Sequence, residues 1–354
     1  MNAKNECSGF GHRFVEIFNC YAFFFQKEDE AAQQVADFFK ERNIPYTRKL
    51  NNIWARNRYW DKDKPTLLLN SHIDTVKPAN GWQRDPFHPG IEAEDILYGL
   101  GSNDAGGPLV ALIATFLHFY EREDLPVNLI MAATAEEEIS GAQGIASVIP
   151  ELGAVDFAIV GEPTQMRMAI AEKGLMVVDG EAKGVSGHAA REEGLNALYL
   201  ALDDIQVIRN LELDRISSLL GKVKMTVTQI EAGKQHNVVP DSCRFVIDVR
   251  TNECYRNEEV FEILQSQLQS ELKPRSFRLN SSGIALEHPL VQSGLNLGLS
   301  YFGSPTLSDQ ALMPFPSLKI GPGDSARSHT ADEYIRLSEI REGIETYIRL
   351  IEGI

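Results

Sequence analysis

Three short, almost entirely apolar runs constrain the fold of this chain most strongly. They span residues 66–70, 127–134 and 154–160. Strands of this composition are typical of sheets that are covered by helices on both faces. Helical patterns lie between and around them, at residues 28–41, 106–120, 142–148 and 338–351, and shorter strands are expected at residues 46–50, 52–57 and 317–320. The alternation predicts an α/β fold with a mostly parallel sheet.

The middle of the chain has a different order of elements. Strand and helix patterns alternate there at residues 175–180, 195–211, 223–230, 244–250, 258–272 and 275–279. The order is β-α-β-β-α-β, which is the ferredoxin-like signature. A chain of 354 residues is long enough for two domains. We therefore expect one domain formed by residues 1–174 and 284–354, with residues 175–283 inserted as a second, ferredoxin-like α+β domain.

Composition excludes several classes of function. The formal net charge of -16 argues against nucleic acid or an anionic membrane surface as the main partner, because both require a basic face. The four cysteines form no C-x-x-C pair, so a disulfide framework or cysteine-zinc site is not indicated and a reducing cytoplasm fits best. The aromatic stretch at residues 14–25 is too short to span a bilayer and is interpreted as a packed segment.

The first candidate site residues follow the apolar run at residues 66–70. His72 and Asp74 are two positions apart, so both side chains can face the same way on an extended backbone. Asp104 lies in the glycine-rich string G-S-N-D-A-G-G, just before a helical pattern. Each of these residues also fits a structural role, as a polar pair at a strand end or as a helix cap. The glycine string lacks the Lys-Ser/Thr of a phosphate-binding loop, which disfavours a nucleotide site.

Further acids follow the other two apolar runs. Glu136, Glu137 and Glu138 come directly after the second run, where adjacent buried carboxylates are costly unless cations neutralise them, although a solvated loop remains an alternative. Glu162 follows the third run, and His329 lies in a loop after residues 317–320. Ligands of open α/β sheets bind at the carboxyl ends of strands, and all of these residues are expected there. Their convergence predicts a metal site. No G-x-S-x-G motif supports a serine hydrolase.

Between Leu67 and Tyr334 the motifs resemble, in order and spacing, those of the two-zinc aminoacylase and carboxypeptidase family. That family includes acetylornithine deacetylase, succinyl-diaminopimelate desuccinylase and glutamate carboxypeptidase. The resemblance implies a zinc-peptidase-like catalytic domain and an inserted domain that acts as a lid and as the interface of a homodimer. It also implies two divalent metal ions, zinc in the first place, with cobalt or manganese as alternatives.

The resemblance further implies a role for each matching residue. His72, Asp104 and Glu162 would bind the first metal ion, while Asp104, Glu138 and His329 would bind the second. Glu137 would be the general base, and Asp74 would support His72. His188 of the partner subunit would stabilise the oxyanion. Asn237 and Arg250 of the inserted domain, together with Gly323, would contact the substrate. Two departures from the family pattern are Ala105, where a lysine is common, and residues 7–26, which lack the expected isoleucine-proline-serine loop.

The strings G-E-P-T and A-E-K-G favour the deacetylase and desuccinylase branch over the dipeptidases. The expected substrate is a small N-acyl amino acid, with N-acetyl-ornithine or a close N-acyl ornithine or citrulline relative of arginine biosynthesis first. Glu192, Glu193 or Asp309 is a candidate to receive a cationic side chain. The alternatives are succinyl-diaminopimelate desuccinylase or a dipeptidase, and, in a different class, a catalytically inactive metal-binding or interaction protein.

Overall fold

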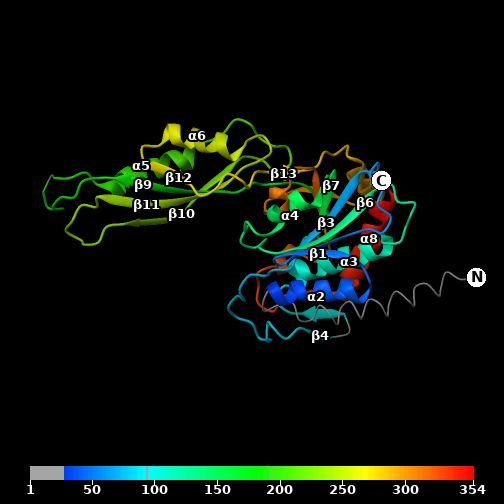
Figure 1. Ribbon diagram of the computed structural model, residues 1–354. Helices are drawn as coiled ribbons and strands as arrows, with labels where there is room; N and C mark the ends of the chain where they lie inside the picture. Colours follow the sequence, from blue (N-terminus) through cyan, green and yellow to red (C-terminus); the bar gives the residue numbers. More distant parts are fainter. Residues whose placement is uncertain (1–27, 93–94, 192) are drawn as a thin grey trace, which may run out of the picture. The chain divides into compact units, whose positions relative to one another are not determined.

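The computed structural model describes residues 28–92, 95–191 and 193–354 (Figure 1). The aromatic stretch at residues 14–25 lies outside this part of the chain. The chain divides into two compact units. The first unit contains the described residues up to Ile170 together with Gly283–Phe302 and Ser308–Ile354, and the second contains Ala171–Ser282 and Gly303–Leu307. None of the helices within the described ranges has the length and apolarity needed to cross a membrane.

A nine-stranded sheet forms the centre of the first unit. Its strands follow the order β1 (Tyr46–Lys49), β2 (Asn52–Arg56), β6 (Asn128–Thr134), β3 (Thr66–His72), β7 (Phe157–Val160), β15 (Ser317–Lys319), β8 (Met168–Glu172) and β13 (Ser282–Gly283), with β14 (Tyr301–Ser304) paired to β8. The neighbours β6, β3, β7 and β15 are parallel, whereas the strands that flank them are antiparallel. The predicted α/β fold with a mostly parallel sheet is confirmed.

Helices cover both faces of this sheet, which explains why its central strands are apolar throughout. One face packs against α2 (Glu28–Glu41), α3 (Gly107–Phe119), α7 (Pro289–Asn296) and α8 (Leu337–Glu352), and the other against α4 (Ile145–Leu152). Along β3, Leu67 and Leu69 lie in the first core and Leu68 in the second. Successive side chains of a strand point to opposite faces, so a strand between two helical layers needs apolar residues at consecutive positions.

A small antiparallel sheet, which the sequence did not predict, lies beside the start of α3. It consists of β16 (Tyr334–Arg336), β5 (Ile96–Tyr98) and β4 (Gly90–Glu92), with β5 in the middle. The helical turn η1 (Ser102–Gly106) follows β5 and leads into α3. Gly107, the first residue of α3, approaches Ile335 so closely that an added Cβ would lie 2.2 Å from its Cδ1 atom, so the start of α3 and β16 pack in direct contact. This sheet therefore joins the segment around Asp104 to the C-terminal segment.

The second unit has the predicted order of elements. Its sheet runs β10 (Lys224–Ala232), β11 (Ser242–Arg250), β9 (Met176–Lys183) and β12 (Glu271–Pro274), and all neighbours are antiparallel. The helices α5 (Ala197–Asn210) and α6 (Asn257–Gln267) share a core with alternate residues of β9 and β11. The chain order β9-α5-β10-β11-α6-β12 is thus the ferredoxin-like β-α-β-β-α-β.

Three predicted elements have wrong boundaries. The helix expected at residues 258–272 ends at Gln267, and the strand expected at residues 275–279 is β12, four residues earlier. The buried carboxylate of Asp204 accepts hydrogen bonds from the backbone N–H groups of Gln269 (3.0 Å) and Ser270 (2.8 Å), which draws the chain out of the helix. The helix expected at residues 142–148 is α4, which begins only after Gly144, a residue with non-helical backbone (φ -79°, ψ -139°).

Candidate metal centre

The site residues of the first unit lie where neighbouring parallel strands end. His72 is the last residue of β3, while Glu137 and Glu138 follow β6, and Glu162 follows β7. Strand β3 lies between β6 and β7 and is parallel to both. The carboxyl ends of parallel neighbours meet at one edge of the sheet, so these side chains are brought together by the sheet itself.

Hydrogen bonding fixes the tautomer of His72, which is almost fully buried. Its Nδ1 atom lies 2.9 Å from the backbone oxygen of Asp74, and because a carbonyl can only accept, Nδ1 carries the hydrogen. The Nε2 atom then faces two carboxylate oxygens, Oδ1 of Asp104 at 3.3 Å and Oε1 of Glu162 at 3.8 Å. A neutral imidazole would turn a lone pair toward these acceptors. The arrangement therefore calls for a proton or a metal ion between them.

Asp104 connects this group of residues to a second one. Its Oδ1 atom faces His72, and its Oδ2 atom lies 3.6 Å from Nε2 of His329. The same His329 nitrogen lies 3.1 Å from Oε2 of Glu138. The potential ligand atoms of Asp104, Glu138 and His329 all lie within 4.8 Å of one another, as do those of His72, Asp104 and Glu162. Each carboxylate oxygen of Asp104 thus serves a different triad.

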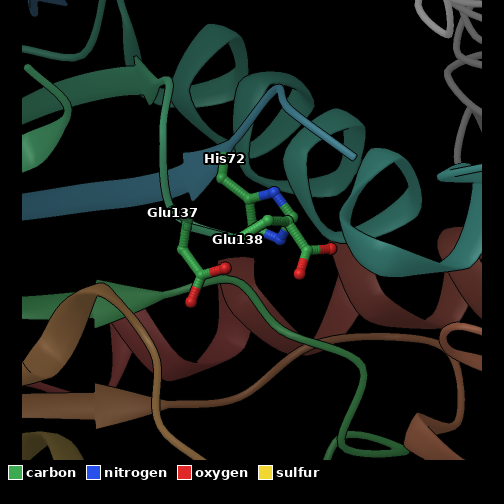
Figure 2. Close-up of side chains that lie close together, drawn as sticks. All are labelled: His72, Glu137 and Glu138. Atoms are coloured by element: carbon green, nitrogen blue, oxygen red, sulfur yellow. The ribbon is translucent and has the colours of Figure 1, made fainter. Parts of the chain in front are cut away.

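Glu137 lies beside both triads. Figure 2 shows its carboxylate and that of Glu138 on either side of the His72 ring, and the ligand atoms of these three residues also lie within 4.8 Å of one another. The preceding Glu136 has a left-handed backbone (φ 59°), and its carboxylate accepts a hydrogen bond from the backbone N–H of Gln143. The three adjacent glutamates therefore separate into one that stabilises its own loop and two that face the site.

The electrostatics of the site call for cations. Burial raises the pKa of Glu162 to about 8 and that of Glu137 well above its usual range, with neighbouring carboxylates adding to the effect. Burial alone would lower the pKa of His72, but its hydrogen bonds to Asp104 and Asp74 outweigh that effect and raise the pKa. The buried Oε1 atom of Glu162 has no hydrogen-bond partner. Two imidazoles and several carboxylates that crowd one another, with an orphaned oxygen among them, fit two divalent metal ions.

Comparison with known proteins identifies the family. The sequence profile of peptidase family M20/M25/M40 matches residues 68–353. The chain belongs to this family. It is accordingly a metal-dependent hydrolase of the M20 family, as the resemblance in its motifs implied.

Three relatives illustrate the sequence relationships of this M20 chain. An uncharacterised metallohydrolase of Methanocaldococcus jannaschii is 26% identical over an alignment of 321 residues that covers 85% of this chain and 89% of the relative. A succinyl-diaminopimelate desuccinylase of Helicobacter pylori is 26% identical over 311 residues, with coverages of 80% and 79%. A [LysW]-lysine/[LysW]-ornithine hydrolase of Sulfurisphaera tokodaii is 26% identical over 338 residues, with coverages of 92% and 90%.

Solved structures agree on the fold. The aminopeptidase PepT of Bacillus cereus superposes with a TM-score of 0.75 at 17% identity, covering 97% of this chain and 98% of that one. A dinuclear metal-binding M20 peptidase of Bacillus subtilis superposes with a TM-score of 0.72 at 16% identity, with coverages of 96% and 99%. The fold of this chain is thus shared with a peptidase of the same family that binds two metal ions.

Asp74 does more in this M20 chain than support His72. Its carboxylate lies 3.5 Å from Nδ1 of His72, and it also accepts hydrogen bonds from the backbone N–H groups of Glu137 (3.1 Å) and Glu138 (3.0 Å). Burial raises the pKa of Asp74, but its interaction with His72, together with the hydrogen bonds from the two N–H groups, outweighs that effect and lowers the pKa. Asp74 therefore ties the end of β3 to the loop that follows β6.

Two buried carboxylates near the site were not among the metal ligands or catalytic residues predicted from the sequence. Glu333 accepts hydrogen bonds from backbone N–H groups of the Asp104 segment, and burial raises its pKa to about 7. Asp309 accepts hydrogen bonds from Asn70 and Thr134, both at 2.9 Å, and burial raises its pKa to about 6. Asp309 is only 3% exposed and is already bound by these partners. Its suggested role as acceptor for a cationic substrate side chain stays a prediction.

The second unit contains the predicted residues His188, Asn237 and Arg250. The backbone N–H of Ala189 donates to the backbone oxygen of Asn237 (3.0 Å). His188, which follows β9, and Asn237, which precedes β11, therefore lie on neighbouring segments, near the end of the sheet where the last residue of β9 pairs with the first of β11. Arg250 is the last residue of β11, and at about 3.3 Å per residue the strand separates its two ends by roughly 26 Å. The structure thus brings His188 and Asn237 together but places Arg250 far from both.

The other predicted substrate residues have different surroundings. Arg250 donates through Nε and Nη2 to the carboxylate of Asp248, at 2.8 and 3.0 Å. Gly323, in the first unit, has a φ of +89°, and a Cβ atom there would lie 2.5 Å from Oδ1 of Asn103. Local packing beside Asn103 thus accounts for this glycine. Glu193 is exposed and lies 3.7 Å from Arg191, and Glu192 is outside the described residues.

Proposed function

We propose that this protein is a two-metal amidohydrolase that removes the acyl group from a small N-acyl amino acid. The observation that carries the proposal is the position of Glu137. Its carboxylate is directed at the site beside His72, yet it belongs to neither of the two triads that Asp104 joins. A catalytically inactive metal-binding protein would have no need of an additional buried carboxylate there, because burying it is costly.

One ion would be held by His72, Asp104 and Glu162, and the other by Asp104, Glu138 and His329. Imidazole and carboxylate ligands suit zinc, and they also accept cobalt or manganese. When bound, such ions lower the pKa of water and polarise the carbonyl oxygen of the substrate amide. Asp74 would keep Glu137 and Glu138 in register with His72 through its hydrogen bonds to their backbone N–H groups.

Glu137 would act as general base and then as general acid. Its carboxylate takes one proton from the attacking water, while the water oxygen bonds to the amide carbon. Glu137 then passes this proton to the amide nitrogen, the C–N bond breaks, and a carboxylic acid and an amine leave. Burial raises the pKa of Glu137, which suits this role because a more basic carboxylate accepts the proton of the water more readily.

The second unit would supply His188, Asn237 and Arg250 to the substrate. Nδ1 of His188 accepts the backbone N–H of Ala190 (3.1 Å), so in the neutral ring the hydrogen is on Nε2, which suits a donor to an oxyanion. Because Arg250 is far from His188 and Asn237, one site would take these residues from two subunits. Arg250 would come from the chain that supplies the metal ligands, and His188 and Asn237 would come from a partner subunit. Arg250 would bind the substrate carboxylate either by releasing Asp248 or through its Nη1 atom while Nε and Nη2 stay on Asp248. The unit would thus be both lid and dimer interface.

N-acetyl-ornithine is the first candidate substrate, with a role in arginine biosynthesis in the cytoplasm. The motifs G-E-P-T and A-E-K-G support this branch, and so does the similarity to a relative named for hydrolysis of an ornithine conjugate. Succinyl-diaminopimelate is the second candidate, because several relatives are named as its desuccinylases. Both substrates are amides of a small diamino acid, so the reaction class is the same.

A substrate panel tests the proposal. Zinc-loaded protein would be offered N-acetyl-ornithine, N-succinyl-ornithine, N-acetyl-citrulline, succinyl-diaminopimelate and simple dipeptides, with chelator-treated protein as the control. We expect metal-dependent hydrolysis of an N-acyl amino acid, led by N-acetyl-ornithine. Preference for a dipeptide would contradict the branch assignment. Full metal occupancy without turnover of any compound would contradict the proposed activity as a whole.

A further inference from the structure

Glu333 joins two segments that are far apart in the sequence. Its Oε2 atom accepts a hydrogen bond from the backbone N–H of Gly101 (3.0 Å). Its Oε1 atom accepts two more, from Asn103 (2.9 Å) and Asp104 (3.0 Å), the latter 229 positions away. The backbone oxygen of Glu333 in turn accepts the N–H of Gly99 (3.1 Å). One side chain thus binds most of the turn that presents Asp104.

A second connection runs in parallel. The amide nitrogen of Asn103 donates to the backbone oxygen of Asp324 (3.0 Å) and to Oγ of Ser328 (3.3 Å), and its Oδ1 atom accepts the N–H of Asp324 (3.0 Å). We call residues 99–106 the Asp104 loop and residues 324–333 the His329 loop. The two loops are therefore held together at both ends of the His329 loop, by the side chain of Asn103 at one end and by that of Glu333 at the other. Between these connections, Asp104 and His329 face each other.

The geometry requires a carboxylate at this position. Glu333 is 2% exposed, so the N–H groups that it binds have no access to bulk water. A carboxylate accepts through both oxygens, whereas an amide of the same size accepts through one and turns N–H groups toward the other donor. Replacement by glutamine would oppose the Gly101 N–H with a second donor and leave it unpaired. Loss of the hydrogen bond from the Gly101 N–H would leave the backbone that leads to Asp104 less firmly held.

We propose that Glu333 is a positioning residue whose carboxylate sets the affinity of the site for the metal ion shared by Asp104, Glu138 and His329. The inference rests on the proposed two-metal site. Glu333 belongs to neither of the two triads; it fixes the distance between the two loops that supply Asp104 and His329 to one ion. Residues that orient metal ligands typically change metal affinity by 10- to 100-fold when they are replaced.

Titration of metal-free Glu333→Gln with Co²⁺ tests this role, with visible absorption reporting coordination and thermal unfolding reporting stability. The matched control is Asp204→Asn in the second unit. Asp204 is also a buried carboxylate that accepts backbone N–H groups distant in sequence, those of Gln269 and Ser270, but it lies in no site. We expect Glu333→Gln to weaken one of the two Co²⁺ equivalents by 10-fold or more. We expect Asp204→Asn to lower the unfolding temperature without changing either equivalent.

Each result decides between a positioning role and a merely structural one. Glu333→Asp, which keeps the charge but shortens the reach, provides a milder variant should the glutamine variant fail to fold, and we expect an intermediate loss of affinity. Wild-type affinity for both equivalents in a variant with a lowered unfolding temperature would overturn the inference while leaving the proposed function intact. Failure of the wild-type chain to bind two ions would instead overturn the proposed site, and the inference with it.

Discussion

Replacement of Glu137 by glutamine separates catalysis from metal binding. The substitution keeps the size of the side chain and removes its charge. Burial raises the pKa of Glu137 in the folded protein, and Glu162, Asp309 and Glu138 raise it further, whereas His72 acts in the opposite direction. A group whose pKa is raised by folding stabilises the folded state only while it is protonated, and that stability is lost as the pH rises through the folded pKa. Above that pKa, the ionised Glu137 is a cost that glutamine removes.

The expected magnitudes follow from these surroundings. General-base catalysis contributes typically about 10²- to 10⁴-fold, which corresponds to roughly 3–5 kcal/mol of transition-state stabilisation. We expect Glu137→Gln to lose activity within this range. Both metal ions should remain, because Glu137 is not required for either triad that contains Asp104. Without metal, at a pH above the folded pKa of Glu137, the variant should unfold at the same temperature as the wild type or higher.

Three measurements on one preparation check this prediction: kcat, metal content by elemental analysis, and the unfolding temperature of the metal-free protein. Glu136→Gln is the matched control, because Glu136 precedes Glu137 on the same loop but bonds to the backbone of Gln143. The control should keep activity within a few-fold. Loss of metal from Glu137→Gln would mean that Glu137 is a ligand, and near-normal kcat would mean that it is not the base.

Three further substitutions test other parts of the account. Asp74→Asn replaces one of the two oxygens that accept the N–H groups of Glu137 and Glu138, so kcat should fall about 10- to 100-fold in steady-state assays, and an unchanged kcat would refute the positioning role. His188→Ala should lower kcat by about 10²–10³-fold with normal metal content, whereas near-normal turnover would exclude it as an oxyanion donor. Leu68→Ala removes a fully buried side chain of the core beneath α4 and should cost about 2–5 kcal/mol in denaturant unfolding; a cost well under 1 kcal/mol would contradict that packing.

The sequence predicts the parts of the fold that depend on local patterns. The apolar runs that form β3, β6 and β7 are readable because both faces of each strand are buried. Residues at the carboxyl ends of such strands converge whatever their separation in the chain. For that reason the sequence alone is enough to group His72, Glu137, Glu138 and Glu162.

Contacts between distant residues explain what the sequence did not predict. Asp204 ends α6 by binding Gln269 and Ser270, more than sixty positions away, and no local signal marks that stop. Glu333 was not singled out in the sequence, and Asp309 was suggested only as an acceptor for a substrate cation, yet both are buried by partners in distant segments. The family resemblance assigned roles to Glu137 and Glu138 and none to Glu136, but no local pattern explains that difference. The left-handed backbone at Glu136 explains it, because it decides which side chains face the site.

Stepwise restoration of metal to the stripped protein tests whether hydrolysis depends on the two-metal site. Chelator-treated chain would receive zinc in fractions of an equivalent while hydrolysis of an N-acyl amino acid and bound metal are followed together. We predict no hydrolysis by the stripped chain and recovery of activity as up to two zinc ions bind per chain through His72, Asp104, Glu138, Glu162 and His329. Hydrolysis by the stripped chain, with no metal bound, would contradict a metal-dependent mechanism.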